Sequence, residues 1–143
     1  MNSPRTIVIT GASDGIGAVA ARALAGPEVN LVVVGRSAQK LAAVAADTGA
    51  TALTADFAEL DQVRSLAQQI RDQVGTIDVL MNNAGGTFAP HPRTADGHEP
   101  NFGINHLTVP ADQPAARPAG RGRRVAGAQH LQRREPIRTR RPR

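Results

Sequence analysis

The chain has 143 residues and no cysteine, which allows one domain and excludes disulfides and thiolate metal sites. Its net charge of +5 is uneven: residues 1–108 carry 7 basic and 10 acidic side chains, whereas residues 109–143 carry 10 arginines against two acids. The sequence shows neither a signal-peptide pattern nor an apolar run of about 18 residues, so we expect a cytoplasmic protein without a membrane segment.

Up to residue 108, short β-branched runs alternate with amphipathic helical patterns. In chain order these are a strand at 5–10, a helix at 16–26, a strand at 30–35, a helix at 37–47 that begins at a Ser37 cap, a strand at 51–56, a helix at 58–73 with Leu60, Val63, Leu66, Ala67 and Ile70 on one face, and a strand at 77–83. This order predicts an α/β fold: a Rossmann-like doubly wound parallel sheet, truncated after the fourth strand and the following helix.

The sequence TGASDGIG, residues 10–17, follows the first strand and opens the first helix. Gly11, Gly15 and Gly17 permit a tight turn and a close approach of backbone amides to a pyrophosphate, and the helix N-terminus adds a positive dipole end. The spacing Gly-x-x-x-Gly-x-Gly differs from the commoner Gly-x-Gly-x-x-Gly fingerprint. Two interpretations are open, a dinucleotide-binding loop and a glycine-rich turn without a ligand; the strand-turn-helix context favours the first.

Two further motifs follow, MNNAGG at 81–86 and NFGINHL at 101–107. Together the three motifs resemble, in order and spacing, those of the short-chain dehydrogenase/reductase family over residues 5–108. The resemblance implies an NAD(P)-binding oxidoreductase that moves hydride between its cofactor and a small-molecule carbonyl or alcohol. Residues 93–107 resemble more narrowly the members that act on retinol-like and other lipophilic carbonyls.

The same resemblance implies roles for individual residues. It implies that Gly11, Ser13, Asp14 and Ile16, in a loop completed by Gly15 and Gly17, contact the cofactor phosphates and ribose, that Asn83, Ala84 and Gly85 line the nicotinamide side, and that Asn105 is the structural and catalytic asparagine. Family members usually oligomerise, but we expect this chain to lack the usual surfaces.

The choice of nicotinamide cofactor depends on the charge that follows the second strand. Arg36, with Ser37 beside it, suits the 2′-phosphate of NADP, so we expect NADP ahead of NAD; the alternative is a solvated arginine. Asp14 argues the other way, because some NADP-preferring relatives carry a basic residue inside the loop. By resemblance Asp56 faces the adenine with Phe57 adjacent, and the alternative for Asp56 is a cap on the third helix.

The family's proton donor is a tyrosine whose phenol is made more acidic by a lysine four residues later. This sequence contains no tyrosine, and its one lysine, Lys40, lies on the second predicted helix. Of the catalytic set only Asn105 can be assigned, so we expect little or no turnover. No metal site is expected either, because the histidines lack metal-ligand spacing: His91, His98, His106 and His130.

These observations divide the chain into an incomplete NAD(P)-binding Rossmann domain, residues 1–108, and an Arg/Pro-rich tail, residues 109–143. We expect the tail to be disordered or poorly packed, which leaves an open strand edge and a tendency to aggregate. A basic tail could bind nucleic acid or a protein partner, yet it has no lysine and no aromatic residue.

A shifted reading frame is the interpretation of the tail that we favour. Read one base later, the codons of 109–119 permit Phe-Leu-Leu-Thr-Asn-Leu-Leu-Leu-Asp-Leu, an apolar helix that continues from NHLT. The codons of 129–133 permit Asn-Thr-Ser-Ser, the kind of strand end on which the family carries its catalytic serine. The change of frame would lie near Thr108 or Val109.

Overall fold

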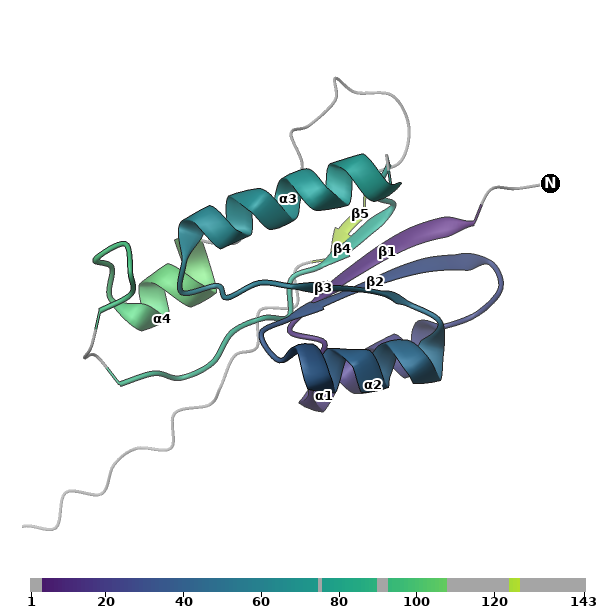
Figure 1. Cartoon of the computed structure of the whole chain (residues 1–143), viewed down its shortest axis with the longest axis horizontal. Helices are drawn as coiled ribbons and strands as arrows, with labels where there is room; N and C mark the ends of the chain where they lie inside the picture. Colours follow the sequence, from purple (N-terminus) through teal and green to yellow (C-terminus); the bar gives the residue numbers. More distant parts are fainter. Residues whose placement is uncertain (1–3, 75, 90–92, 108–123, 127–143) are drawn as a thin grey trace, which may run out of the picture.

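The computed structural model describes residues 4–74, 76–89, 93–107 and 124–126. The elements in chain order are β1 Arg5–Thr10, α1 Gly15–Leu24, β2 Val29–Gly35, α2 Ala38–Thr48, β3 Thr51–Thr54, α3 Leu60–Val74, β4 Val79–Met81, α4 Pro100–Phe102, the π-helical turn η1 Gly103–Leu107, and β5 Arg124–Ala126. All strands are parallel, in the order β3-β2-β1-β4-β5 (Figure 1). The predicted doubly wound α/β fold is confirmed.

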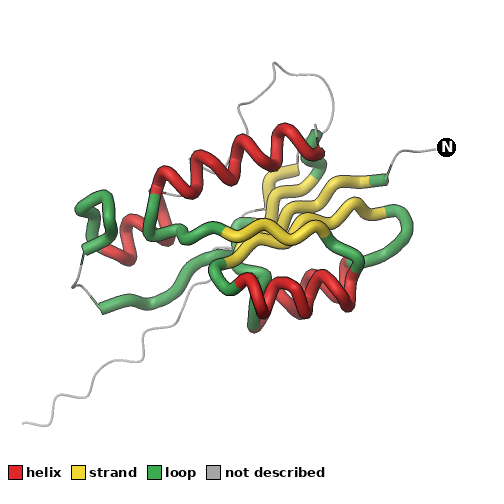
Figure 2. Tube along the Cα trace, in the orientation of Figure 1, coloured by secondary structure: helices red, strands yellow, loops and turns green. Residues whose placement is uncertain are grey.

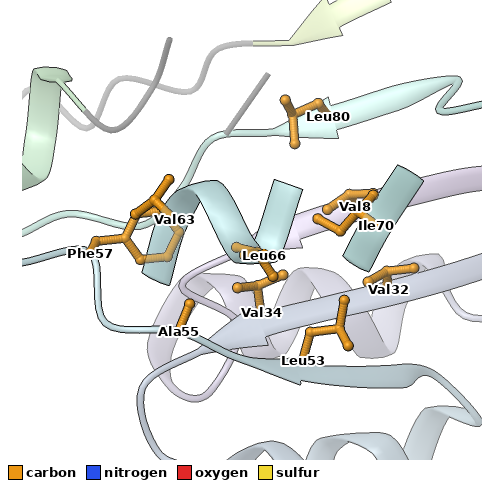
Figure 3. Packing of buried hydrophobic residues seen from close by; sticks show 10 residues of the cluster. All are labelled: Val8, Val32, Val34, Leu53, Ala55, Phe57, Val63, Leu66, Ile70 and Leu80. Carbon is orange, nitrogen blue, oxygen red and sulfur yellow. The ribbon is translucent and has the colours of Figure 1, made fainter. Parts of the chain in front are cut away.

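Helices cover both faces of the sheet, α1 and α2 on one face and α3 on the other (Figure 2). Successive side chains of a strand point to opposite faces, so the continuous apolar runs of β1 and β2 supply both cores. Val8, Val32 and Val34 pack with the buried face of α3 (Figure 3). Ile9 and Val33 pack on the side of α1 and α2.

Helix boundaries follow local capping groups. Ser37 caps α2 as predicted, since its hydroxyl accepts a hydrogen bond from the backbone N–H of Lys40 at 3.3 Å. In α3 four of the five predicted face residues are buried and Leu60 is half-buried. This helix begins at Leu60, two residues later than predicted. None of the helices in the described part of the chain is long and apolar enough to span a membrane.

A short strand that the sequence did not predict lies beside β4. Residues 124–126, in the middle of the basic tail, form β5, with Leu80 in register with Val125. The edge of β4 presents unpaired backbone N–H and C=O groups, and an extended segment satisfies them. Residues 109–123 and 127–143 lie outside the described residues, so the expectation of a poorly packed tail stays a prediction for them.

Candidate cofactor-binding site

The glycine loop lies at the carboxyl end of β1, packed against the segment that follows β4. Gly11 has a φ of 67°, and a Cβ atom there would lie 2.8 Å from Cα of Ala84. A Cβ on Gly17 would lie 2.3 Å from the carbonyl oxygen of Gly11. Both positions therefore require glycine, because any side chain would collide with backbone.

The loop has open space where a ligand would approach it. Gly15 has a φ of 53°, and a Cβ atom there would meet no described atom within 4 Å. Asp14 caps α1, accepting a hydrogen bond from the N–H of Gly15 at 2.8 Å. This space lies at the N-terminus of α1, where unpaired N–H groups and the positive end of the helix dipole favour an anion such as a pyrophosphate. Ile16 borders it, with 57% of its surface exposed.

Asn83 joins the glycine loop to the segment after β4. Its Nδ2 donates to the carbonyl oxygens of Thr10 at 3.1 Å and Gly11 at 3.2 Å. The backbone N–H groups of Asn83 and Ala84 both donate to the hydroxyl of Thr10, which is buried. These bonds hold the ends of β1 and β4 together at the point where the strand order reverses, where open α/β sheets bind ligands.

Asn105 reaches the same segment from η1. Its Nδ2 donates to the carbonyl oxygen of Gly86 at 2.8 Å, and its Oδ1 accepts from the N–H of Gly86 at 2.9 Å. A Cβ on Gly85 would lie 2.9 Å from that Oδ1. The structure thus brings Asn105 against the segment Asn83–Gly85, which is distant from it in the sequence.

Positive charge lies beside the loop at the end of β2. Arg36 is exposed directly after β2, and Ser13 packs on the preceding Gly35. Lys40, one helical turn further along, forms an ion pair with the carboxylate of Asp14. The hydrogen bond from Lys40 lowers the pKa of Asp14. The hydrogen bond from the N–H of Gly15 and the positive charge of Lys40 lower this pKa further. Lys40 therefore offsets the acidic charge in the loop.

No role is assigned to Lys40 from the sequence. Arg36 lies directly before the Ser37 cap of α2 and Lys40 lies in the first turn, and neither position indicates a contact with Asp14, 26 residues earlier. Because Ser37 is the cap of α2, its hydroxyl is engaged with the backbone of Lys40.

Asp56 and Phe57 follow β3 at the same edge of the sheet. The carboxylate of Asp56 accepts from the N–H of Ala58 at 2.9 Å, which closes a turn before α3. Asp56 does not cap α3: the N–H of Leu60 donates to Asp96 at 2.9 Å. The ring of Phe57 is buried in the core beneath α3 (Figure 3), so a contact with adenine would have to come from its backbone.

Two of the four histidines, His98 before α4 and His106 on η1, lie beside the ring of Phe102 on α4. The ring of Phe102 stacks on His106 at a centroid distance of 5.3 Å and meets His98 edge-on at 6.5 Å. No group of three metal-ligating side chains occurs among the described residues. His91 and His130 lie outside them.

Comparison with known proteins identifies the family. A family model described as short chain dehydrogenase matches residues 5–102, more than half of the chain. The chain belongs to the short-chain dehydrogenase family. It is therefore related to NAD(P)-dependent oxidoreductases, as the motifs predicted.

Individual relatives agree with this assignment. The chain is 36% identical to human retinol dehydrogenase 13 over 110 residues, covering 72% of the chain and 33% of the human protein. It is 47% identical to the ketoacyl reductase HetN of Nostoc sp. over 94 residues, 59% of the chain and 33% of that protein. The chain thus spans about a third of the length of these curated relatives.

A solved structure with a similar fold contains a nicotinamide cofactor. It is a blue fluorescent protein from a metagenomic library in complex with NADPH, with a TM-score of 0.64 and 31% identity. The similarity covers 76% of this chain and 49% of that one.

Proposed function

We propose that this chain binds NADP(H) at the glycine loop, as the cofactor half of a reductase acting between a lipophilic carbonyl and its alcohol. The ion pair between Lys40 and Asp14 carries the proposal, because the positive charge of Lys40 offsets the acidic charge that would repel a 2′-phosphate. Arg36 then has a favourable setting for a bidentate contact with that phosphate. The NADPH complex of a related fold supports this choice.

Different residues would contact different parts of the cofactor. Backbone groups of the glycine loop and the N-terminus of α1 would hold the pyrophosphate, Arg36 and Lys40 the adenosine end, and the segment Asn83–Gly85 the nicotinamide. Bound NADPH supplies a hydride. The 143 residues contain no tyrosine to supply the matching proton. Loss of a general acid typically costs about 10²- to 10⁴-fold in rate, so we propose binding with little or no turnover.

Calorimetry with NADPH and NADH tests the cofactor preference. A charge-assisted contact to the 2′-phosphate contributes about 1.5–3 kcal/mol, so NADPH is expected to bind about 10- to 100-fold more tightly. Arg36→Asp is expected to abolish or reverse the preference. Arg64→Asp makes the same charge change on α3, on the other face of the sheet, and is expected to leave it intact. Equal affinities in the unmutated chain would refute the proposal.

A nucleic-acid-binding function has one observation in its favour, the concentration of 10 arginines in residues 109–143. It predicts that random-sequence DNA or RNA binds the chain with an affinity that falls steeply with salt. It also predicts that saturating NADPH does not affect this binding. A cytoplasmic location stays a prediction under either function.

A further inference from the structure

Two asparagines four residues apart hold the same backbone segment after β4. Asn105 pairs with both backbone groups of Gly86, as described above. Asn101 pairs with Phe88 in the same way: its Oδ1 accepts from the N–H of Phe88 at 2.9 Å, and its Nδ2 donates to the carbonyl oxygen at 2.9 Å. The two asparagines, one on α4 and one on η1, therefore meet alternate residues of the segment.

We call the paired hydrogen bonds of Asn105 to Gly86 the first clamp and those of Asn101 to Phe88 the second clamp. The second clamp is needed because the first acts on a glycine, whose backbone is flexible. Asn83 and Ala84 are fixed to Thr10, but the chain then passes through Gly85 and Gly86, which have the greatest backbone freedom. Asn105 holds the second of these glycines. Asn101 then fixes the direction in which the segment leaves them, because it pairs with both backbone groups of Phe88.

The amide of Asn101 has a defined orientation. Its Nδ2 also donates to the carboxylate of Glu99 at 2.6 Å, and Glu99 in turn accepts from the N–H groups of Asn101 and Phe102 at the start of α4. The carboxylate of Glu99 requires a donor and the N–H of Phe88 requires an acceptor. The amide NH₂ of Asn101 must therefore face Glu99, and its oxygen must face the N–H of Phe88. An aspartate here would lose both donated bonds and place two carboxylates side by side.

We propose that Asn101 is a positioning residue for the nicotinamide half of the cofactor. Together with Asn105 it fixes residues 86–88, the direct continuation of the segment Asn83–Gly85. This inference rests on the proposed function. Asn101 is expected to affect the nicotinamide end of the dinucleotide alone. Arg36 and Lys40, which would hold the adenosine end, follow β2, whereas the segment held by Asn101 follows β4.

The test compares NADPH with adenosine 2′,5′-bisphosphate, which keeps the adenosine end and lacks the nicotinamide. In calorimetry on the full chain, Asn101→Asp is expected to weaken NADPH binding about tenfold, because the segment that would contact the nicotinamide is no longer held in place. Its affinity for adenosine 2′,5′-bisphosphate is expected to stay unchanged. Asn30→Ala is the matched control, since it removes an amide contact with Thr6 near the opposite end of the sheet and should change neither affinity.

Each other outcome overturns the inference in a recognisable way. If both ligands weaken equally, Asn101 only supports the fold; if neither weakens, the clamp is irrelevant to the cofactor. If the unmutated chain binds neither ligand, the proposed function itself fails. Circular dichroism checks that each variant folds. If Asn101→Asp unfolds, Asn101→Ser replaces it, because serine removes the hydrogen bonds to Phe88 without adding charge.

Discussion

At the scale of single residues, two glycines of the cofactor loop differ in the space around them. A Cβ on Gly17 would lie 2.3 Å from the backbone of Gly11 and 2.6 Å from Nδ2 of Asn83, whereas at Gly15 it would enter open space at a positive φ. We expect Gly15→Ala to cost ~1–2 kcal/mol of unfolding free energy. Gly17→Ala should cost ~3 kcal/mol or more and abolish NADPH binding. Urea unfolding measures both; similar costs would contradict this loop geometry.

The ion pair of Asp14 and Lys40 gives a pH-dependent prediction. The pKa of Asp14 is lowered in the folded chain, mainly by its hydrogen bond with Lys40. A lowered pKa stabilises the fold above the unfolded value of about 3.9, and that contribution is lost as the pH falls through the folded pKa. Lys40→Gln should therefore raise the pKa of Asp14, as an NMR titration would show, and should weaken the preference for NADPH. An unchanged titration would show that the pair does not form in solution.

A site residue could be predicted from the sequence when the residue it contacts lies close to it in the chain. Gly11 and Gly17 stand in a local motif, so their roles follow from spacing. Lys40 acts on a residue 26 positions earlier and Asn101 on one 13 positions earlier, and no local pattern indicates either pairing. The family resemblance supplied Asn83 and Asn105, whose partners are also distant.

At the scale of elements, α3 takes its N-terminal cap from a distant turn. The carboxylate of Asp96 accepts a hydrogen bond from the N–H of Leu60, 36 residues earlier. Loss of an N-cap costs about 1 kcal/mol, so Asp96→Ala should lower the unfolding free energy by that amount, while Asp96→Asn, which keeps an acceptor oxygen at the same reach, should recover most of it. Asp72→Ala, which removes an exposed contact with Gln68 on the same helix, is the control. Equal effects at the two aspartates would rule out the cap.

Element types could be predicted but several boundaries could not. Continuous apolar runs predicted the strands in order from β1 to β4, because burial on both faces of a parallel sheet leaves a strong signal. The start of α3 was misplaced because its cap comes from elsewhere. β5 was missed because strand pairing is a long-range interaction, and residues 124–126 carry no strand pattern of their own.

At the scale of the whole molecule, the two faces of the sheet are unequally covered. Leu80 is buried on the side of α3, whereas Val79 and Met81 are only half-buried on the side of α1. On α1 itself, Val19 has 66% of its surface exposed. This exposed apolar surface agrees with the predicted tendency to aggregate, which stays a prediction.

The change in composition after Thr108 leads to a prediction about the gene. We propose that residues 109–143 are translated out of frame relative to the family sequence. Sequencing the coding DNA should show that a one-base change near Val109 opens a frame encoding an apolar helix, a strand ending in serine, and a Tyr-x-x-x-Lys motif. An early stop codon in that frame would contradict the proposal.

The fluorescence of NADPH, followed over time with the 143-residue chain and a panel of lipophilic aldehydes and ketones, separates binding from turnover. We expect a change in emission on mixing, because the cofactor binds, and then a constant signal, because the sequence has no tyrosine to donate the proton. No change on mixing would contradict the proposed binding, and a decay to the non-fluorescent oxidised form would show that the chain is a working reductase.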